Sequence, residues 1–79
     1  MSRTEIFNKV VGYIQAQLPV DAAKIQDSTR LTEDLNADSA NLMMLIMDLE
    51  GEFNLTVDDD VLASIQTVGD IVNYLEAHA

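Results

Sequence analysis

The apolar residues of this chain recur mainly three and four positions apart, which is the period of an α-helix. Ser2 and Glu5 have the spacing of a capping box, and Pro19 disfavours helical geometry at the residue before it. Between these signals lies one apolar stripe, made of Ile6, Phe7, Val10, Val11, Ile14 and Leu18. We therefore predict a first helix over residues 2–18.

A second stripe extends from Asp38 to Phe53. Asp38 is a suitable N-cap because its carboxylate can accept hydrogen bonds from the backbone N–H groups that follow. Gly51 weakens this helix by about 1 kcal/mol relative to alanine. The apolar face that we expect to be buried consists of Leu42, Leu45, Ile46, Leu49 and Phe53.

The rest of the pattern predicts a short helix and a final longer one. Residues 58–60 are aspartates, which complement the dipole at the start of a short helix. Thr67 and Asp70 have capping-box spacing before a last apolar stripe. Residues 20–38 form a long connection, and its apolar residues Ile25, Leu31 and Leu35 are expected to hold it on the core. The sequence thus predicts an all-α four-helix bundle with three main helices, one short helix and a long first loop.

Charge divides the chain into two unequal parts. The formal net charge is −10, from four basic and fourteen acidic residues. All four basic residues lie in the first thirty positions, whereas residues 31–79 hold eleven acids and no Lys or Arg. Nucleic acids and anionic membranes bind clustered basic residues, so neither is an expected partner. The acidic part is either a solvated face or a docking surface for basic partners.

Length and composition narrow the function classes further. A chain of 79 residues forms one domain, here residues 1–79, with a core too small for a deep enzyme cleft. The absence of cysteine excludes disulfides, zinc thiolate sites and cysteine nucleophiles. The N-terminal segment lacks the pattern of a signal peptide, and residues 39–47, the longest nearly uncharged stretch, are too few to cross a bilayer. We expect a cytoplasmic protein.

The junction between the long loop and the second helix carries the clearest chemical signal. Ser39 falls in the first turn of that helix, next to the capping residue Asp38, so its hydroxyl should point into solvent. A phosphate on this hydroxyl would lie close to free backbone N–H groups and to the positive end of the helix dipole. The position therefore suits a phosphodiester.

At this junction the chain resembles the acyl carrier proteins, whose hallmark is Asp-Ser-Leu in a context close to Asp-Leu-Gly-Ala-Asp-Ser-Leu. The matching run, residues 34–40, is Asp-Leu-Asn-Ala-Asp-Ser-Ala. The similarity continues through residues 45–53 and resumes at residues 67–75, Thr-Val-Gly-Asp-Ile-Val-Asn-Tyr-Leu. It therefore covers nearly the whole chain, with both flanking signatures at the separation typical of the family.

The resemblance implies that Ser39 carries 4′-phosphopantetheine, transferred from coenzyme A by a separate magnesium-dependent phosphopantetheinyl transferase. The thiol of this arm would hold acyl groups as thioesters and deliver them to fatty-acid or polyketide-type enzymes, acyl synthases and acyltransferases with basic docking patches. Asp38 matches the acidic residue that helps the transferase to recognise its substrate. The protein would be a monomeric carrier without a catalytic site or a metal. The core residues expected to open for an acyl chain are Phe7, Val10, Leu42, Leu45, Ile46, Val68 and Ile71.

The chain departs from the family pattern around Ser39. Ala40 replaces the usual leucine, Asn36 replaces glycine, Asn41 stands where an acid is common, and Met44 occupies a position usually held by glutamate. Flexible methionines suit adaptable apolar docking, so we interpret the chain as a specialised carrier with a less electrostatic partner contact. The expected contact residues are Asp38, Met43, Met44, Met47, Asp48 and Glu52.

A carrier for aminoacyl, D-alanyl or peptidyl groups remains an alternative, and so does an unmodified acidic interaction module. An EF-hand starting at Asp34 is excluded because Ser39 and Leu45 stand where the calcium loop needs glycine and glutamate. A hydrolase triad of Ser39 with His78 lacks the Gly-x-Ser-x-Gly turn, and His78 lies in the terminal tail.

Overall fold

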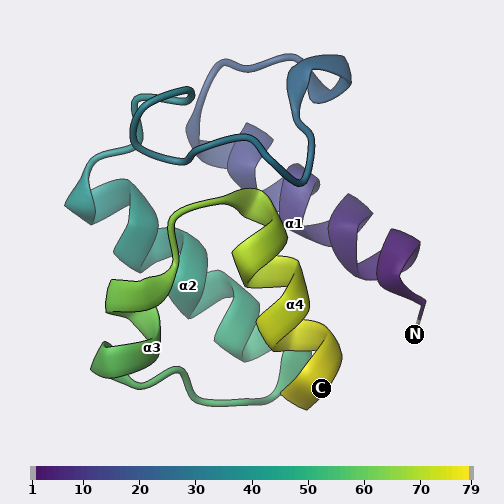
Figure 1. Cartoon of the computed structure of the whole chain (residues 1–79), viewed down its shortest axis with the longest axis vertical. Helices are drawn as coiled ribbons and strands as arrows, with labels where there is room; N and C mark the ends of the chain where they lie inside the picture. Colours follow the sequence, from purple (N-terminus) through teal and green to yellow (C-terminus); the bar gives the residue numbers. More distant parts are fainter. Residues whose placement is uncertain (1, 79) are drawn as a thin grey trace.

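Helices account for most of residues 2–78, the part of the chain that this computed structural model describes (Figure 1). They are α1 (Arg3–Gln17), the 3-10 helix η1 (Ala22–Lys24), α2 (Ser39–Phe53), α3 (Asp59–Ser64) and α4 (Val68–His78). No β-strand occurs among these residues. The predicted all-α bundle, with one short helix and a long loop after the first helix, is confirmed.

Local capping sets where α1 and α4 begin. The Ser2 Oγ accepts a hydrogen bond from Glu5 N at 3.2 Å, and Glu5 Oε1 accepts one from Ser2 N at 3.3 Å. The Thr67 Oγ1 accepts from Asp70 N at 3.1 Å, while Asp70 Oδ2 accepts from the backbone N of Thr67 at 3.1 Å. Both predicted capping boxes are therefore confirmed, and each satisfies orphan backbone donors at a helix start.

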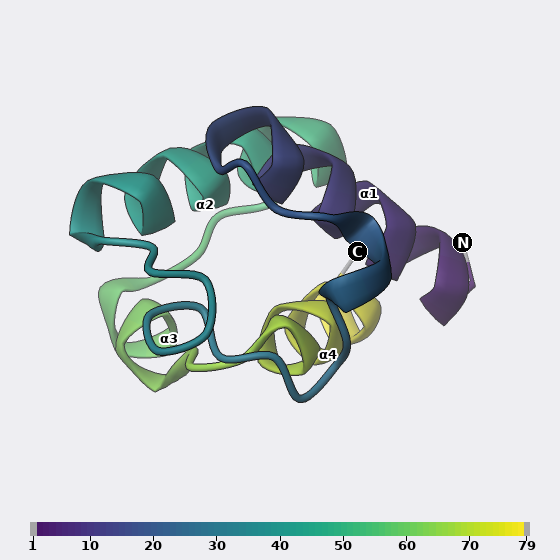
Figure 2. The same ribbon diagram turned by 90° about the horizontal axis from the view of Figure 1, so that it is seen from above.

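The core forms where α1 packs against both α2 and α4. Figure 2 shows α1 and α2 above, with α3 and α4 below them. The buried apolar residues are Ile6, Val10, Val11, Ile14, Ile25, Leu31, Ala37, Leu45, Ile46, Leu49, Val68, Ile71, Val72 and Leu75. Four residues of the predicted stripes are only partly buried and pack against the edge of this core: Phe7, Leu18, Leu42 and Phe53.

The long connection between α1 and α2 is more ordered than its sequence suggests. Asp21 Oδ1 accepts a hydrogen bond from Ala23 N at 3.0 Å, and this cap supports the single turn η1, which the apolar pattern did not predict. Ile25 and Leu31 are buried and Leu35 is half-buried, as expected for residues that hold the loop on the core. The loop therefore packs onto the bundle rather than extending from it.

Backbone hydrogen bonds join this loop to the junction between α3 and α4. Leu31 N donates to Gln66 O at 3.0 Å, and an isolated antiparallel bridge pairs residues 30 and 67. Val68 N donates to Thr29 O at 3.0 Å, and Gly69 N donates to the backbone O of residue 27 at 2.8 Å. We call these contacts between residues 27–31 and 66–69 the loop clasp. The clasp fixes the loop against the start of α4.

The clasp requires glycine at position 69. A Cβ atom there would lie 2.8 Å from Asp27 O and 3.2 Å from Asp27 Cβ. We therefore expect Gly69→Ala to lower the free energy of unfolding by about 1–3 kcal/mol, since the loop backbone must move away. In the matched variant Gly12→Ala, no atom lies within 4 Å of the new Cβ, so the same change should stabilise α1 by about 0.5–1 kcal/mol. Urea denaturation measures both changes, and a Gly69→Ala protein as stable as the parent would contradict this account.

Candidate functional site

Ser39 is the first residue of α2, and its side chain is exposed. The preceding residue, Asp38, has extended backbone geometry and is the N-cap, as predicted. Its Oδ1 accepts a hydrogen bond from Asn41 N at 2.9 Å, and Asn41 Oδ1 accepts one from Asp38 N at 3.2 Å. Asn41 thus completes a reciprocal capping box that the sequence analysis missed, although the three-residue spacing from Asp38 was a signal for it.

A left-handed residue brings the chain into α2. Asn36 has a φ of 56°, a conformation that asparagine tolerates better than most residues other than glycine. The next residue, Ala37, is buried, and its N–H donates to Leu31 O at 3.0 Å. Asn36 therefore replaces the glycine of the family pattern without losing the turn. The turn buries residue 37 and leaves Ser39 on the surface.

The start of α2 can accommodate a phosphodiester on the Ser39 hydroxyl. The N–H groups in the first turn of a helix have no partner within the helix, and the dipole adds positive potential there. The Asp38 carboxylate accepts a hydrogen bond from Asn41 N, so it is engaged in capping α2. Ala40 adds only a methyl group beside the exposed serine. These features fit an anionic group held by backbone donors, with no basic side chain required.

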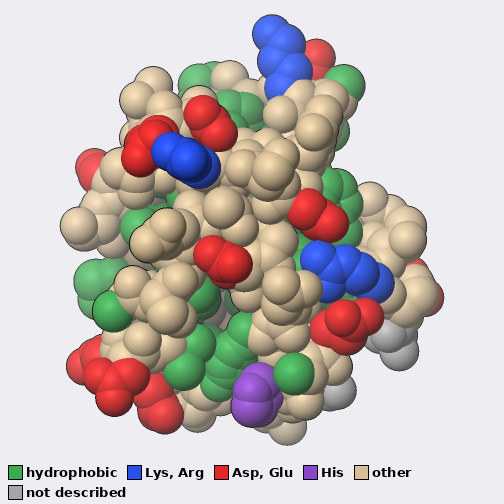
Figure 3. Space-filling model, in the orientation of Figure 1, with side chains coloured by type: hydrophobic (Ala, Val, Ile, Leu, Met, Phe, Trp, Pro, Cys, Tyr) green, Lys and Arg blue, Asp and Glu red, His purple; other side chains and the backbone are tan. Residues whose placement is uncertain are grey.

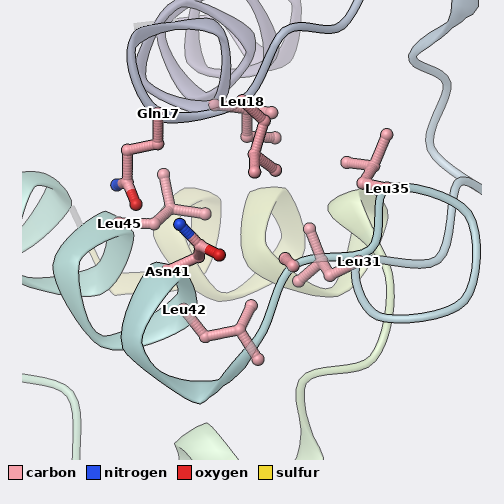
Figure 4. Close-up of a pocket in the computed structure, with 9 residues that line it drawn as sticks. Gln17, Leu18, Leu31, Leu35, Asn41, Leu42 and Leu45 are labelled. Carbon is pink, nitrogen blue, oxygen red and sulfur yellow. The ribbon is translucent and has the colours of Figure 1, made fainter.

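A small apolar cavity lies next to this site, between the end of α1, the long loop and the start of α2 (Figure 4). Its volume is about 10 Å³. It is lined by Ile14, Gln17, Leu18, Leu31, Leu35, Ala37, Asn41, Leu42 and Leu45. Of the residues predicted to open for an acyl chain, Leu42 and Leu45 line this cavity. The others lie elsewhere, Val10, Ile46, Val68 and Ile71 in the core and Phe7 at its edge.

Three methionines form an exposed apolar face on α2. The exposed fractions are 56% for Met43, 57% for Met44 and 65% for Met47. Ser39, Met43 and Met47 follow one another at intervals of four residues, so they share one side of the helix. We call Met43, Met44 and Met47 the methionine face. It begins one turn after Ser39, with exposed Asp38 before it and exposed Asp48 beyond it.

Glu52 differs from the other predicted contact residues because its carboxylate is bound by α1. Lys9 Nζ lies 3.3 Å from Glu52 Oε2, and Tyr13 donates its hydroxyl hydrogen to Glu52 Oε1 at 2.7 Å. These hydrogen bonds, the one from Tyr13 first, hold the pKa of Glu52 below its ordinary value. The same bond raises the pKa of the Tyr13 hydroxyl. Glu52 therefore joins the far end of α2 to α1.

Ion pairs engage several of the few basic side chains. Arg3 lies 3.3 Å from Asp27 and 3.4 Å from Glu76, and Arg30 pairs with Glu33. Figure 3 shows acidic side chains gathered over α3, on the side of the molecule that it displays. Residues 31–79 contain no Lys or Arg, so α2 and the segments that follow it carry acidic side chains without basic ones.

The residues of the alternative calcium and hydrolase sites have other contacts in the described part of the chain. Within residues 2–78, no three His, Cys, Asp or Glu side chains are placed to hold a metal ion. Asp34, which would be the first ligand of the EF-hand considered above, accepts a hydrogen bond from Arg30 N at 2.8 Å. His78 is the last residue of α4, and its ring lies against that of Tyr74 with the centroids 4.2 Å apart and the planes tilted by 41°. Across these same residues, every helix is too short or too polar to traverse a membrane.

Comparison with known proteins agrees with this geometry. A family model described as "Phosphopantetheine attachment site" matches residues 8–75. The acyl carrier protein of Thermotoga maritima is 49% identical over 75 residues, which is 95% of this chain and 93% of the relative. That of Lactobacillus acidophilus is 42% identical and covers 99% of this chain and 98% of the relative.

A solved structure extends the agreement to the fold. The acyl carrier protein from Enterococcus faecalis superposes with a TM-score of 0.86 at 33% identity, over 100% of both chains. Sequence, attachment-site model and fold thus agree over nearly the whole length. The chain belongs to the acyl carrier protein family, and it carries acyl groups on a covalently attached 4′-phosphopantetheine.

Proposed function

We propose that Ser39 is the attachment residue for the 4′-phosphopantetheine arm. The observation that carries this proposal is its place as the exposed first residue of α2, between the Asp38 cap and the methionine face. The other serines have different settings. Ser2 caps α1, Ser64 donates its hydroxyl hydrogen to Val61 O at 2.7 Å, and Ser28 lies in a loop turn.

When bound, the arm supplies the thiol that holds the acyl group. The protein itself exposes the serine to a separate phosphopantetheinyl transferase and holds the phosphate at the start of α2. We assign no catalytic site to it, and we treat residues 1–79 as one domain that acts as a monomer. Because the arm comes from coenzyme A, we place the carrier in the cytoplasm.

The cavity beside Ser39 is proposed to shelter the cargo. Leu42, one turn after Ser39, lines it together with Leu31 and Leu45, so the lining is suited to hydrocarbon. At about 10 Å³ the cavity has room for roughly one water molecule, far less than an acyl chain needs. The cavity must therefore widen, through separation of the start of α2 from the end of α1, before a chain can enter.

Partner enzymes are proposed to dock on the exposed side of α2. The docking surface consists of the methionine face with Asp38, Asp48 and Glu52 around it. An apolar pocket rimmed by Lys and Arg complements such a surface, because the acids steer the encounter and the methionines provide contact area. Glu52 contributes charge at the far end of α2 while Lys9 and Tyr13 hold it. Transferases, acyl synthases and acyltransferases with such patches are the expected partners.

The attachment site is tested by intact mass. After incubation with coenzyme A, Mg²⁺ and a broad-specificity phosphopantetheinyl transferase, the parent should gain one phosphopantetheinyl group. Ser39→Ala should gain none, because the nucleophilic hydroxyl is absent. Ser28→Ala, which removes another exposed hydroxyl, should gain the group like the parent. Modification of a folded Ser39→Ala protein would place the site elsewhere.

Variants at Asp38 separate helix capping from recognition by the transferase. Asp38→Ala removes the acceptor for Asn41 N, so the free energy of unfolding should fall by about 1 kcal/mol. Asp38→Asn keeps an acceptor and should stay close to the parent in stability, yet it loses the charge. Urea denaturation and the rate of transferase loading are measured for both. If Asp38→Asn is loaded as fast as the parent, the charge of Asp38 plays no part in recognition.

The methionine face is tested at Met44. Met44→Glu places a charge where we propose apolar contact, so KM for transferase loading should rise about fivefold, equivalent to about 1 kcal/mol. Met44→Leu keeps the apolar contact and should behave like the parent. Asn8→Glu adds the same charge on the exposed side of α1 and serves as the control for net charge. An unchanged or lower KM for Met44→Glu would count against apolar docking.

A further inference from the structure

Gln17, the last residue of α1, reaches across to the backbone of α2 (Figure 4). With the carboxamide assigned in the orientation that suits its neighbours, Nε2 donates to Asn41 O at 3.0 Å and Oε1 accepts from Leu45 N at 3.0 Å. The opposite orientation of the carboxamide would set oxygen against oxygen and N–H against N–H, so the hydrogen bonds fix the assignment. One side chain thus makes two hydrogen bonds to one turn of the neighbouring helix.

The two backbone atoms that Gln17 binds belong to the same turn of α2. In an α-helix, the N–H of residue 45 pairs with the carbonyl of residue 41. Gln17 therefore binds two backbone groups that already pair with each other within α2. If the Gln17 side chain withdraws, Leu45 N–H and Asn41 C=O still have each other as partners. A side chain that inserts at such a point is also a recognised cause of local helix bending.

This contact is located at the wall of the cavity beside Ser39. Gln17 and Asn41 are the two polar side chains among the residues that line it. The Asn41 side chain is engaged in the capping box with Asp38, so it is tied to α2 itself. Of these two polar side chains, only that of Gln17 links α1 to α2. The separation of these helices at the cavity is thus opposed by two directional bonds in addition to apolar packing.

We propose that Gln17 is a latch that sets how readily the cavity widens for an acyl chain. This inference rests on the proposed sheltering of the cargo in that cavity. When a chain enters, the carboxamide releases Asn41 O and Leu45 N and turns to solvent, while α2 keeps its internal hydrogen bond. Gln17 is then a positioning residue: it biases which cargo lengths are sheltered without contacting the attachment chemistry.

The test compares Gln17→Met with Gln15→Met. Methionine keeps the length of the side chain but cannot make either hydrogen bond. Gln15 is an exposed glutamine of the same helix, outside the cavity lining, and its Nε2 donates to Val20 O at 3.2 Å. It serves as the matched control because Gln15→Met loses a hydrogen bond that does not involve α2. Each protein is loaded on Ser39 with octanoyl- or acetyl-phosphopantetheine, using the acyl-coenzyme A and the transferase. Cleavage of the thioester by hydroxylamine is then followed by intact mass.

A sheltered octanoyl chain should slow cleavage, whereas acetyl is too short to enter and reports the unprotected rate. Loss of two neutral hydrogen bonds should shift the opening equilibrium about tenfold, so octanoyl cleavage in Gln17→Met should slow by up to that factor. The acetyl rate should not change, and Gln15→Met should match the parent in both. If Gln17→Met matches the parent while octanoyl is protected, the latch is refuted and the shelter stands.

A second measurement needs no variant. The side-chain amide signals of Gln17 are compared by NMR between acetyl-loaded and octanoyl-loaded parent protein. Release of the latch should shift these signals and speed their hydrogen exchange in the octanoyl form alone. Identical signals and exchange in the two forms overturn the proposal. A parent that accepts the arm but shows no octanoyl protection overturns both the shelter and the latch, and leaves attachment at Ser39 intact.

Discussion

The geometry of this carrier depends on the loop clasp, the backbone hydrogen bonds between residues 27–31 and 66–69. The clasp divides the long connection after α1 into two shorter spans, which limits the conformations that each can adopt. It requires the close approach of Gly69 to the backbone of Asp27. From the clasped Leu31, one further hydrogen bond places Ala37 in the core and so leaves Ser39 at the surface. The exposed serine is thus positioned by backbone contacts and not by a large core.

The contact between α1 and α2 has a polar link at each end. At the end of α2, Glu52 is held by Lys9 and Tyr13, whose charge and hydroxyl are accessible to solvent. At its start, Gln17 binds the α2 backbone beside the cavity. Between these links, α2 contributes the buried residues Leu45, Ile46 and Leu49. The cavity lies at the end of this contact nearest Ser39. The proposed widening would therefore separate α2 from α1 there while the Glu52 link holds the other end.

The sequence predicts the features that depend on residues only a few positions apart in the chain. The capping boxes at Ser2 and Thr67 follow from a spacing of three positions, and the N-cap at Asp38 follows from its residue type. The exposure of Met44 follows from its place off the apolar stripe. Contacts between distant segments are different. The hydrogen bonds of Gln17 go to backbone groups, which every residue possesses, so no residue type marks the partner. The loop clasp also consists of backbone hydrogen bonds, so no residue type in the sequence predicts it either.

In the proposed docking, the acidic side chains act at long range and the methionine face acts at close range. Charge acts over about 8 Å at physiological ionic strength, so it attracts any enzyme that presents a basic patch. Such attraction raises the rate of encounter but discriminates poorly among partners that share that patch. Contact with Met43, Met44 and Met47 acts only at close range and requires an apolar surface of matching shape. Where the family pattern has a glutamate, Met44 presents an exposed apolar side chain. In the proposed docking it replaces a charge that any basic patch could bind with a contact that fewer partners could satisfy. In the proposed docking, selectivity would therefore reside in the apolar part of the surface.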